Sequence, residues 1–291
     1  FGRVSPHQKK LIIQTLKKAG HTTAMTGDGV NDAPALKKSD IGIAMGITGT
    51  EVSKDAASMI LTDDNFATIV KAVANGRNIY NNIKNSIKFL LSGNASGIAA
   101  VLYTSLAALP VPFAPVHLLF INLLTDSLPA LAVSMEKSRK DLLKEKPRSS
   151  DESILTKDFI IEFVIQGILI AAATIFAYHC GLKTNVETAQ TMAFATLGLI
   201  QLFHAYNVKS VYQSILTVGP FKSKTFNWSI LVSFILLMAT IIVEPLEGIF
   251  HVTKLDLSQW GIVMAGSFSM IIIVEIIKFV QRKLGFDKNA I

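Results

Sequence analysis

The sequence predicts an α/β portion followed by a membrane α-helical bundle, and three observations lead to this fold class. Of the 291 residues, 50% are hydrophobic and only 17% are charged, whereas soluble domains carry about 25% charged residues. Residues 1–84 mix Lys, Asp and Gly with short apolar runs. Most of 86–280 consists instead of long apolar stretches separated by polar clusters. A purely soluble, disordered or fibrous protein is therefore excluded.

Helices and strands alternate in residues 1–66, as is typical of a doubly wound parallel sheet. Ser5 and Pro6 suit the N-cap and the first position of a helix, and Gly20 suits its end. Strands are predicted at 22–25, 40–45 and 58–61, and further helices at about 31–38 and 50–57. The first domain predicted is therefore the α/β portion, 1–66.

A cytoplasmic stalk helix is predicted at 67–85, and it continues into the membrane. No proline occurs from Asn65 to Leu109, so one unbroken helix of roughly 65 Å can form at 1.5 Å per residue. Such a helix would link the α/β portion mechanically to the membrane domain, which is predicted at 86–291.

Six stretches of this membrane domain are apolar enough to cross a bilayer, which takes about 20 residues. These six predicted spans are 86–109, 116–135, 159–180, 190–208, 227–244 and 260–280. The first two are joined by residues 110–115, a proline-rich connection that is too short for anything but a tight turn. The first two spans therefore form a hairpin.

The orientation follows from the Lys and Arg residues between the spans, because such residues mark the cytoplasmic side. Alternate connections and the tail are basic, through Lys137, Arg139, Lys140, Lys144, Lys146, Arg148, Lys157, Lys209, Lys222, Lys224, Lys278, Arg282, Lys283 and Lys288. The other connections hold only Lys183 and Lys254. We expect the α/β portion and the C-terminus to face the cytoplasm. The net charge of +7 is then explained by basic residues next to the membrane spans. No basic-aromatic cluster supports nucleic-acid binding.

The second predicted span contains an oxygen-rich polar set. Asn122, Thr125 and Asp126 fall at helical spacings of three and four, so we expect them on one face, and Pro129 removes a backbone hydrogen bond just beyond them. An amide oxygen, a hydroxyl and a carboxylate suit a hard cation such as Ca²⁺. The alternative is a polar cluster that packs helices together. The cost of placing Asp126 near the middle of a membrane favours a cation site.

Other polar residues occur within the spans. Asn94 lies in the first, and Gln201, His204 and Asn207 lie three residues apart in the fourth. A metal site at His204 would need ligands that the surrounding sequence does not offer, so we interpret it as a packed or hydrogen-bonded histidine. For Glu275 in the last span we predict pairing with Lys278.

The sharpest motif of the α/β portion is Thr-Gly-Asp-Gly-Val-Asn-Asp-Ala-Pro at residues 26–34. It follows a predicted strand and opens a helix, so Asp28 lies at the carboxyl end of a strand, where open sheets place their sites. Gly27 allows a tight turn and a close approach. Carboxylates at Asp28 and Asp32, with the Asn31 amide, can hold Mg²⁺ and orient phosphate oxygens.

This motif resembles the hinge motif of P-type cation-transporting ATPases. The segment Asn-Leu-Leu-Thr-Asp-Ser-Leu-Pro-Ala at 122–130 is similar to the sixth membrane helix of their Ca²⁺-pump branch. The likeness extends over essentially the whole chain. It implies the last part of the phosphorylation domain, which is haloacid-dehalogenase-like and doubly wound, followed by membrane helices five to ten.

The resemblance also implies roles for single residues near the phosphate. Asp28 would be the Mg²⁺ ligand of the phosphorylation site, and Asn31 and Asp32 would support the phosphate and its surroundings. Lys9 matches the family lysine that contacts the phosphoryl group, where an ammonium is a suitable counter-charge.

In the membrane, Asn122, Thr125 and Asp126 match the Ca²⁺ ligands of the family, with Asn94 as a further candidate. Two-site pumps have a glutamate at the position of Gly97 and another at the position of Gln201. Because ligand charge largely sets the affinity of a site for a hard cation, their absence predicts one Ca²⁺ site rather than two.

The chain lacks other parts of the family pattern. It contains no Asp-Lys-Thr-Gly-Thr segment with the phosphorylated aspartate, no nucleotide-binding domain and no Thr-Gly-Glu loop. We therefore expect it to be inactive alone and to act with the upstream remainder of the same pump, which would bind most of the ATP. The intact protein is expected to be a monomer in a bacterial plasma membrane.

Other functions remain open at the level of the sequence. A pump for Mn²⁺ or another cation is the nearest alternative, because Mn²⁺ also favours oxygen ligands. A truncated membrane module that regulates a full pump belongs to a different class. A membrane-anchored phosphatase of the same hydrolase superfamily would not explain the polar set in the second span.

Overall fold

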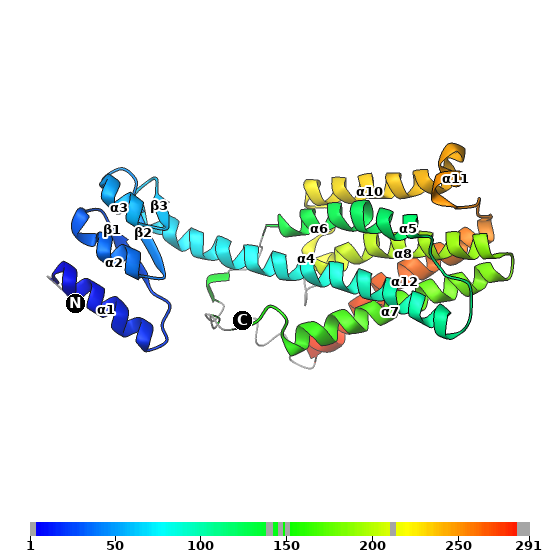
Figure 1. The fold of residues 1–291 in the computed structure, drawn as a ribbon, viewed down its shortest axis with the longest axis horizontal. Helices are drawn as coiled ribbons and strands as arrows, with labels where there is room; N and C mark the ends of the chain where they lie inside the picture. The colour runs from blue at the N-terminus through cyan, green and yellow to red at the C-terminus, as the bar shows by residue number, and fades with distance from the viewer. Residues whose placement is uncertain (1–3, 138–141, 145–147, 149–151, 210–213, 284–291) are drawn as a thin grey trace. The chain divides into compact units, whose positions relative to one another are not determined.

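The computed structural model describes residues 4–137, 142–144, 148, 152–209 and 214–283 (Figure 1). Four basic residues used to predict the orientation, Arg139, Lys140, Lys146 and Lys288, lie outside these residues. By its internal contacts the chain divides into two units, the first formed chiefly by residues up to Arg77 and the second beginning at Asn78.

Helix α1 (Pro6–Lys18) opens the first unit and begins as the sequence predicts. Ser5 is the N-cap, and its hydroxyl accepts a hydrogen bond from the Gln8 amide at 3.3 Å. The Gln8 side chain accepts one in return from the Ser5 amide at 2.7 Å. This reciprocal capping satisfies backbone donors that the first turn of a helix leaves without partners.

Three short strands form a parallel sheet in the order β1-β2-β3. They are β1 (Ala24–Gly27), β2 (Ile41–Met45) and β3 (Met59–Leu61). The segments between them are helical, with η1 (Val30–Asp32), α2 (Ala33–Lys38) and α3 (Glu51–Ala56). The predicted alternation of parallel strands and helices is confirmed.

The first strand begins at Ala24, two residues later than the sequence predicts, and Thr23 just before it bonds to the Asp40 side chain. The Thr23 amide and hydroxyl both donate to the Asp40 carboxylate at 2.9 Å. Lys17 lies 2.7 Å from the other oxygen of that carboxylate. These hydrogen bonds, the one from Lys17 foremost, lower the pKa of Asp40 to about 2. The Asp40 side chain thus fastens the end of α1 to the start of β2.

Helix α4 (Phe66–Leu106) is a single helix of 41 residues, which confirms the prediction of an unbroken helix. Its side chains at four-residue spacing donate to carbonyls in and just after a later helix, α6 (Ser127–Ser134). Asn78 donates to Glu136 O at 2.9 Å, Asn82 to Ser134 O at 3.2 Å and Ser86 to Ala130 O at 2.9 Å. This face of α4 is therefore tied to the end of α6.

The second predicted span is not a uniform helix. It is built from α5 (Pro115–Phe120), a π-helical segment η2 (Ile121–Asp126) and α6 (Ser127–Ser134). Pro129 explains the change, because its ring excludes the carbonyl of residue 125 from the usual α-helical position and it donates no hydrogen bond. Wider π turns of this kind are often found at functional sites.

The rest of the second unit is helical. The long helices are α7 (Lys157–Leu182), α8 (Val186–Val208), α10 (Lys224–Ile242) and α12 (Leu257–Lys283). Shorter elements are η3 (Leu142–Lys144), α9 (Ile215–Val218) and α11 (Glu244–Phe250).

Five helical segments of the described chain are long and apolar enough to cross a membrane, against the six spans predicted. They are Phe66–Leu106, Pro115–Ser134, Lys157–Leu182, Lys224–Ile242 and Leu257–Lys283. The remaining prediction, 190–208, falls on α8, which is less apolar. Helix α8 contacts α6, α7, α10 and α12 (Figure 1), and nearly all of its second half is buried. Its polar residues Gln201, His204 and Asn207 are therefore covered by protein.

Close packing between α7 and α8 generates a test of this arrangement. A Cβ atom added at Gly181 would lie 2.5 Å from Ala189 Cα, so Gly181→Ala should force the two helices apart at a cost of about 1–3 kcal/mol. Gly261→Ala is the matched control, because nothing lies within 4 Å of its added Cβ. Thermal unfolding in detergent should show a lower Tm for the first variant only. An equal Tm for the two variants would contradict the tight α7–α8 contact.

Candidate functional site

The loop after β1 carries the predicted phosphate-site residues. The backbone carbonyl of Asp28 accepts hydrogen bonds from the Thr50 amide at 2.8 Å and from the Ser53 hydroxyl at 3.1 Å. These bonds fix the loop while the Asp28 side chain remains exposed. An exposed carboxylate at the carboxyl end of a parallel strand is a suitable ligand for Mg²⁺.

Asp32 lies in the same loop and is brought together with Lys9 of α1. The Lys9 ammonium is 2.7 Å from Asp32 Oδ1, and the Asp32 side chain is 11% exposed. Gly27 makes this placement possible, since a Cβ atom at residue 27 would lie 2.5 Å from Asp32 Cβ. Asn31 is exposed beside them. One loop and one helix therefore gather a carboxylate, an amide and a carboxylate-ammonium pair, which suits a magnesium–phosphate group.

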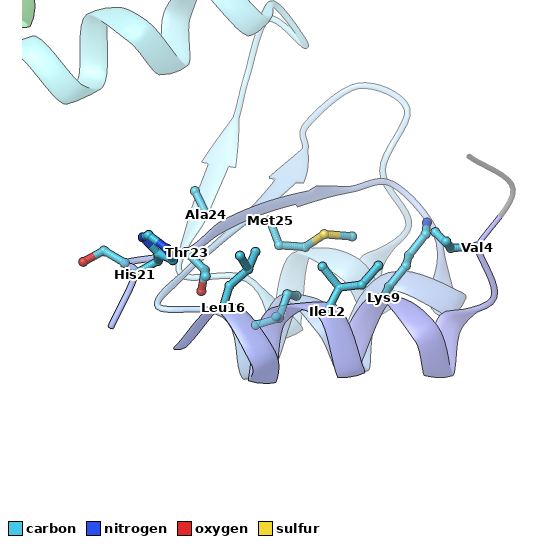
Figure 2. A pocket seen from close by; sticks show the side chains of 10 residues that line it. Val4, Lys9, Ile12, Leu16, His21, Thr23, Ala24 and Met25 are labelled. Carbon is cyan, nitrogen blue, oxygen red and sulfur yellow. The ribbon is translucent and has the colours of Figure 1, made fainter. Parts of the chain in front are cut away.

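A cavity of about 450 Å³ lies between α1 and β1 (Figure 2). Its lining is mainly apolar, with Ile12, Leu16 and Met25 among the contributors. Figure 2 shows Lys9 at one end and His21 at the other. None of the described residues that line it is acidic, and Lys9, which pairs with Asp32, is where the cavity adjoins the carboxylate loop.

In the second unit, Thr125 and Asp126 are 0% and 1% exposed. The Thr125 hydroxyl donates to Ile121 O at 2.8 Å, which leaves its oxygen lone pairs available. Neither carboxylate oxygen of Asp126 has a hydrogen-bond partner within the described part of the chain. Burying a carboxylate without a partner is costly, and a bound cation would remove that cost. These two residues therefore fit a cation site.

Asn122 and Asn94 are not buried with Thr125 and Asp126. Both are exposed in this structure, and the Asn94 amide donates to Leu90 O of its own helix at 3.0 Å. The expectation that Asn122 shares one face with Thr125 and Asp126 assumed α-helical spacing. The π segment pairs residues five apart, and only the latter two are buried. The roles of Asn122 and Asn94 as ligands stay predictions.

No group of three or more His, Cys, Asp or Glu side chains that could hold a metal ion occurs among the residues described. Among the described residues, a cation at Asp126 would therefore meet chiefly neutral oxygens of hydroxyl, amide or backbone groups. This composition suits hard cations such as Ca²⁺ and Mn²⁺ better than soft ones.

The contact between Gln201 of α8 and Gly93 of α4 was not predicted from the sequence. The Gln201 side chain is completely buried, and a Cβ atom at Gly93 would lie 1.8 Å from Gln201 Nε2. Only glycine at residue 93 leaves room for that amide. The Gln201 amide nitrogen and oxygen have no hydrogen-bond partner among the described residues. Nothing in the spacing of the two residues signals this contact, because it joins α4 to α8.

His204 is packed, as predicted, with its ring stacked on Phe89 at 6.2 Å between centroids. Neither ring nitrogen has a hydrogen-bond partner in the part of the chain described. The predicted pairing of Glu275 with Lys278 is confirmed at 3.5 Å. Lys278 also donates to Asn207 O at 2.8 Å, at the end of α8.

Further Lys–Glu pairs that the sequence did not reveal join different helices. Lys88 of α4 pairs with Glu162 of α7, and Lys209, just after α8, lies 3.1 Å from Glu136, which follows α6. The lysine side chains are 5% and 2% exposed. Charges buried in this way require partners, so the pairs help to fix which helices lie together.

Comparison with known proteins identifies the family. Residues 110–280 match the family described as Cation transporting ATPase, C-terminus. The chain is 42% identical over 301 residues to Calcium-transporting ATPase 1 of Bacillus cereus, an alignment that covers 97% of this chain and 34% of that protein. With the Calcium-transporting ATPase of Bacillus subtilis the identity is 43% over 270 residues, covering 92% and 30%.

Similarity extends beyond bacteria. Calcium-transporting ATPase 3, endoplasmic reticulum-type, of Arabidopsis thaliana is 38% identical over 315 residues, covering 98% of this chain and 32% of that protein. The chain thus spans about a third of the length of these relatives. The family match covers more than half of the chain, and the relatives match nearly all of it. The chain belongs to the P-type cation-transporting ATPases and contains their C-terminal portion.

Proposed function

We propose that this chain is the C-terminal part of an ATP-driven pump that transports Ca²⁺ out of the cytoplasm through an aspartyl-phosphate intermediate. The observation that carries the proposal is the buried Asp126 carboxylate, which has no hydrogen-bond partner among the described residues. An anionic group in such a place calls for a cation. The names of the relatives, all calcium-transporting ATPases, support Ca²⁺ as that cation.

The loop after β1 would serve the phosphate end of the reaction. In this proposal Asp28 holds Mg²⁺, which neutralises charge on the phosphate, and Lys9 supplies a further positive charge through its ammonium group. Asp32 orients Lys9 through their 2.7 Å contact. Asn31, exposed in the same loop, is available to donate a hydrogen bond to a phosphate oxygen. The phosphorylated aspartate and most of the ATP-binding residues would come from the remainder of the pump.

A single Ca²⁺ site is proposed because, among the described residues, Asp126 is the one buried carboxylate with neither oxygen paired. Gln201 is neutral, and it fills the space beside Gly93. Gly97 supplies no ligand side chain. Thr125, Asp126 and, with a change in its surroundings, Asn122 would form the site, and Asn94 is the further candidate.

The membrane arrangement proposed has six spans: the five helical segments named above and α8, which is the fourth in chain order. Its burial by α6, α7, α10 and α12 supports a helix that crosses the bilayer inside the bundle. The basic connections support a C-terminus in the cytoplasm. We propose a bacterial plasma membrane, a monomeric intact pump and the first unit as part of a haloacid-dehalogenase-like phosphorylation domain.

Coupling between phosphate chemistry and cation binding would pass through α4. This helix follows β3 in the chain, and its Asn78, Asn82 and Ser86 side chains hold carbonyls at the end of α6. A displacement of α4 would therefore be passed on to the helix that carries Asp126. The binding of the cation and the phosphorylation of the pump would then influence each other reciprocally.

The first test is Asp126→Asn in the full-length protein. Removal of the charged ligand should raise the Ca²⁺ concentration that activates phosphorylation by ATP. The increase should exceed the roughly 10- to 100-fold loss of affinity that follows removal of a residue that only supports a ligand. Asp158→Asn, which changes an exposed carboxylate of α7, is the control and should behave as the wild type. High-affinity Ca²⁺ activation retained in the Asp126 variant would refute the assignment. Activation of the wild type by Mn²⁺ and not by Ca²⁺ would instead establish the manganese pump.

The second test concerns the phosphate loop. Gly27→Ala should displace Asp32, because the added Cβ would lie 2.5 Å from Asp32 Cβ, and a misplacement of about 1 Å can cost about 100-fold in rate. The steady-state level and rate of phosphorylation by ATP should both fall. Gly76→Ala, where nothing lies within 4 Å of the added Cβ, should phosphorylate normally. A normal rate in the Gly27 variant would count against a role for the Lys9–Asp32 pair.

A further inference from the structure

His117, at the start of α5, uses both of its ring nitrogens although its side chain is 0% exposed. The Ala114 amide donates to Nδ1 at 3.2 Å. On the other side of the ring, Nε2 is 2.5 Å from Phe250 O, at the end of α11. The ring thus joins two parts of the chain that are far apart in sequence.

These contacts fix the protonation state of the ring. A nitrogen that accepts a hydrogen bond from an amide N–H carries no proton itself, so Nδ1 is bare. The carbonyl of Phe250 can only accept, so Nε2 carries the hydrogen and donates it. The geometry therefore requires a neutral imidazole in one tautomer. A second proton, on Nδ1, would face the Ala114 N–H group and break that contact.

Aromatic packing makes the same ring part of a junction of three helices. His117 is stacked on Phe194 of α8, with centroids 4.4 Å apart and planes 18° from parallel. Phe120 of α5 meets the edges of Phe194 at 5.9 Å and of Phe250 at 5.2 Å. We call His117, Phe120, Phe194 and Phe250 the aromatic junction.

The aromatic junction lies directly before the segment that carries the cation-site residues. Helix α5 ends at Phe120, and η2 begins at Ile121 and ends at Asp126. A segment with π-helical hydrogen bonds has an alternative in the ordinary α-helix, which would rotate its side chains relative to the bundle. Anchoring α5 to α8 and α11 fixes the rotation at which η2 starts, and with it the direction of Asp126.

We propose that His117 is a positioning residue for the cation site, and that protonation of its ring from the side opposite the basic connections releases the aromatic junction and weakens cation binding. This inference rests on the proposed function of Asp126. It adds regulation by pH on one side of the membrane, exerted through a residue that does not touch the cation.

The other titratable groups on the elements packed against His117 are few. Helix α5 has none besides His117, and η2, which is packed against α5, has Asp126. Helix α11 has Glu244 and Glu247, and His251 follows it. Glu244 pairs with Lys254 at 2.6 Å. On α8, Glu187 lies in the first turn, and His204 and Tyr206 lie well beyond Phe194 in sequence. Of the groups on these described elements, His251 is the other imidazole in the neighbourhood of His117, so it provides the matched control.

The experiment uses the full-length pump in sealed vesicles, with the pH on that side lowered in steps from about 7.5 to about 3.5, which extends well below the ordinary titration of imidazole near 6.5. In the wild type, the Ca²⁺ concentration for half-maximal phosphorylation should rise by up to about tenfold per pH unit once the His117 ring takes up its proton. His117→Gln offers a donor and an acceptor that do not titrate, so its pH response should be smaller than that of the wild type and reduced to the competition of protons for the Asp126 carboxylate. His251→Asn should keep the wild-type response, and His117→Phe should bind Ca²⁺ more weakly at every pH.

A wild-type pH response retained in His117→Gln, or lost in His251→Asn, would overturn the inference. Normal Ca²⁺ affinity in His117→Phe would overturn it as well. Failure of the proposed function is recognised separately, because the wild type would then show no Ca²⁺ activation at any pH. In that case the Tm in detergent still tests the ring: acidification should lower it more in the wild type than in His117→Gln, and equal shifts would overturn the inference.

Discussion

The second unit depends on one constraint: polar groups placed among apolar helices must find partners within the protein, because no water competes for them. The hydrogen bonds from α4 to the carbonyls at the end of α6 meet this constraint, as do the Lys–Glu pairs of Lys88 with Glu162 and Lys209 with Glu136. Each of these contacts joins different helices. Apolar packing is tolerant of small rotations, whereas these polar contacts are not, so they select one arrangement of the bundle.

Some buried polar groups among the described residues, such as the Gln201 amide and the His204 ring, lack a hydrogen-bond partner, and Asp126 is the carboxylate among them with neither oxygen paired. The buried lysines Lys88, Lys209 and Lys278 of the same unit, in contrast, are paired. The backbone is also irregular at Asp126, because Pro129 interrupts the α-helical pattern and η2 takes its place. The proposed site would have to bind and release a cation, so full satisfaction by the protein alone would work against it. Irregular backbone and an unsatisfied charge are therefore found together.

Periodicity and composition were sufficient to predict much of this architecture. The parallel strands, the capped helix α1, the unbroken α4 and the apolar spans all follow from local signals such as Ser5-Pro6 or the absence of proline from 65 to 109. The exposure of Asn122 could not be predicted, because it depends on a change of helix type. The contact of Gly93 with Gln201 could not be predicted either, because it depends on how two distant helices are rotated. Only the resemblance to a known family predicted that Lys9 and Asp32 belong to the same site.

The hydrogen bond from Lys278 to Asn207 O at the end of α8 has a consequence for biogenesis. The last carbonyls of a helix have no partners within that helix, and here one of the partners belongs to α12, which leaves the ribosome long after α8. During synthesis the end of α8 therefore remains incompletely satisfied until α12 is inserted beside it. The final helix acts as a check on assembly: a chain released before α12 would present an uncapped helix end in its bundle, which the membrane quality-control machinery could recognise.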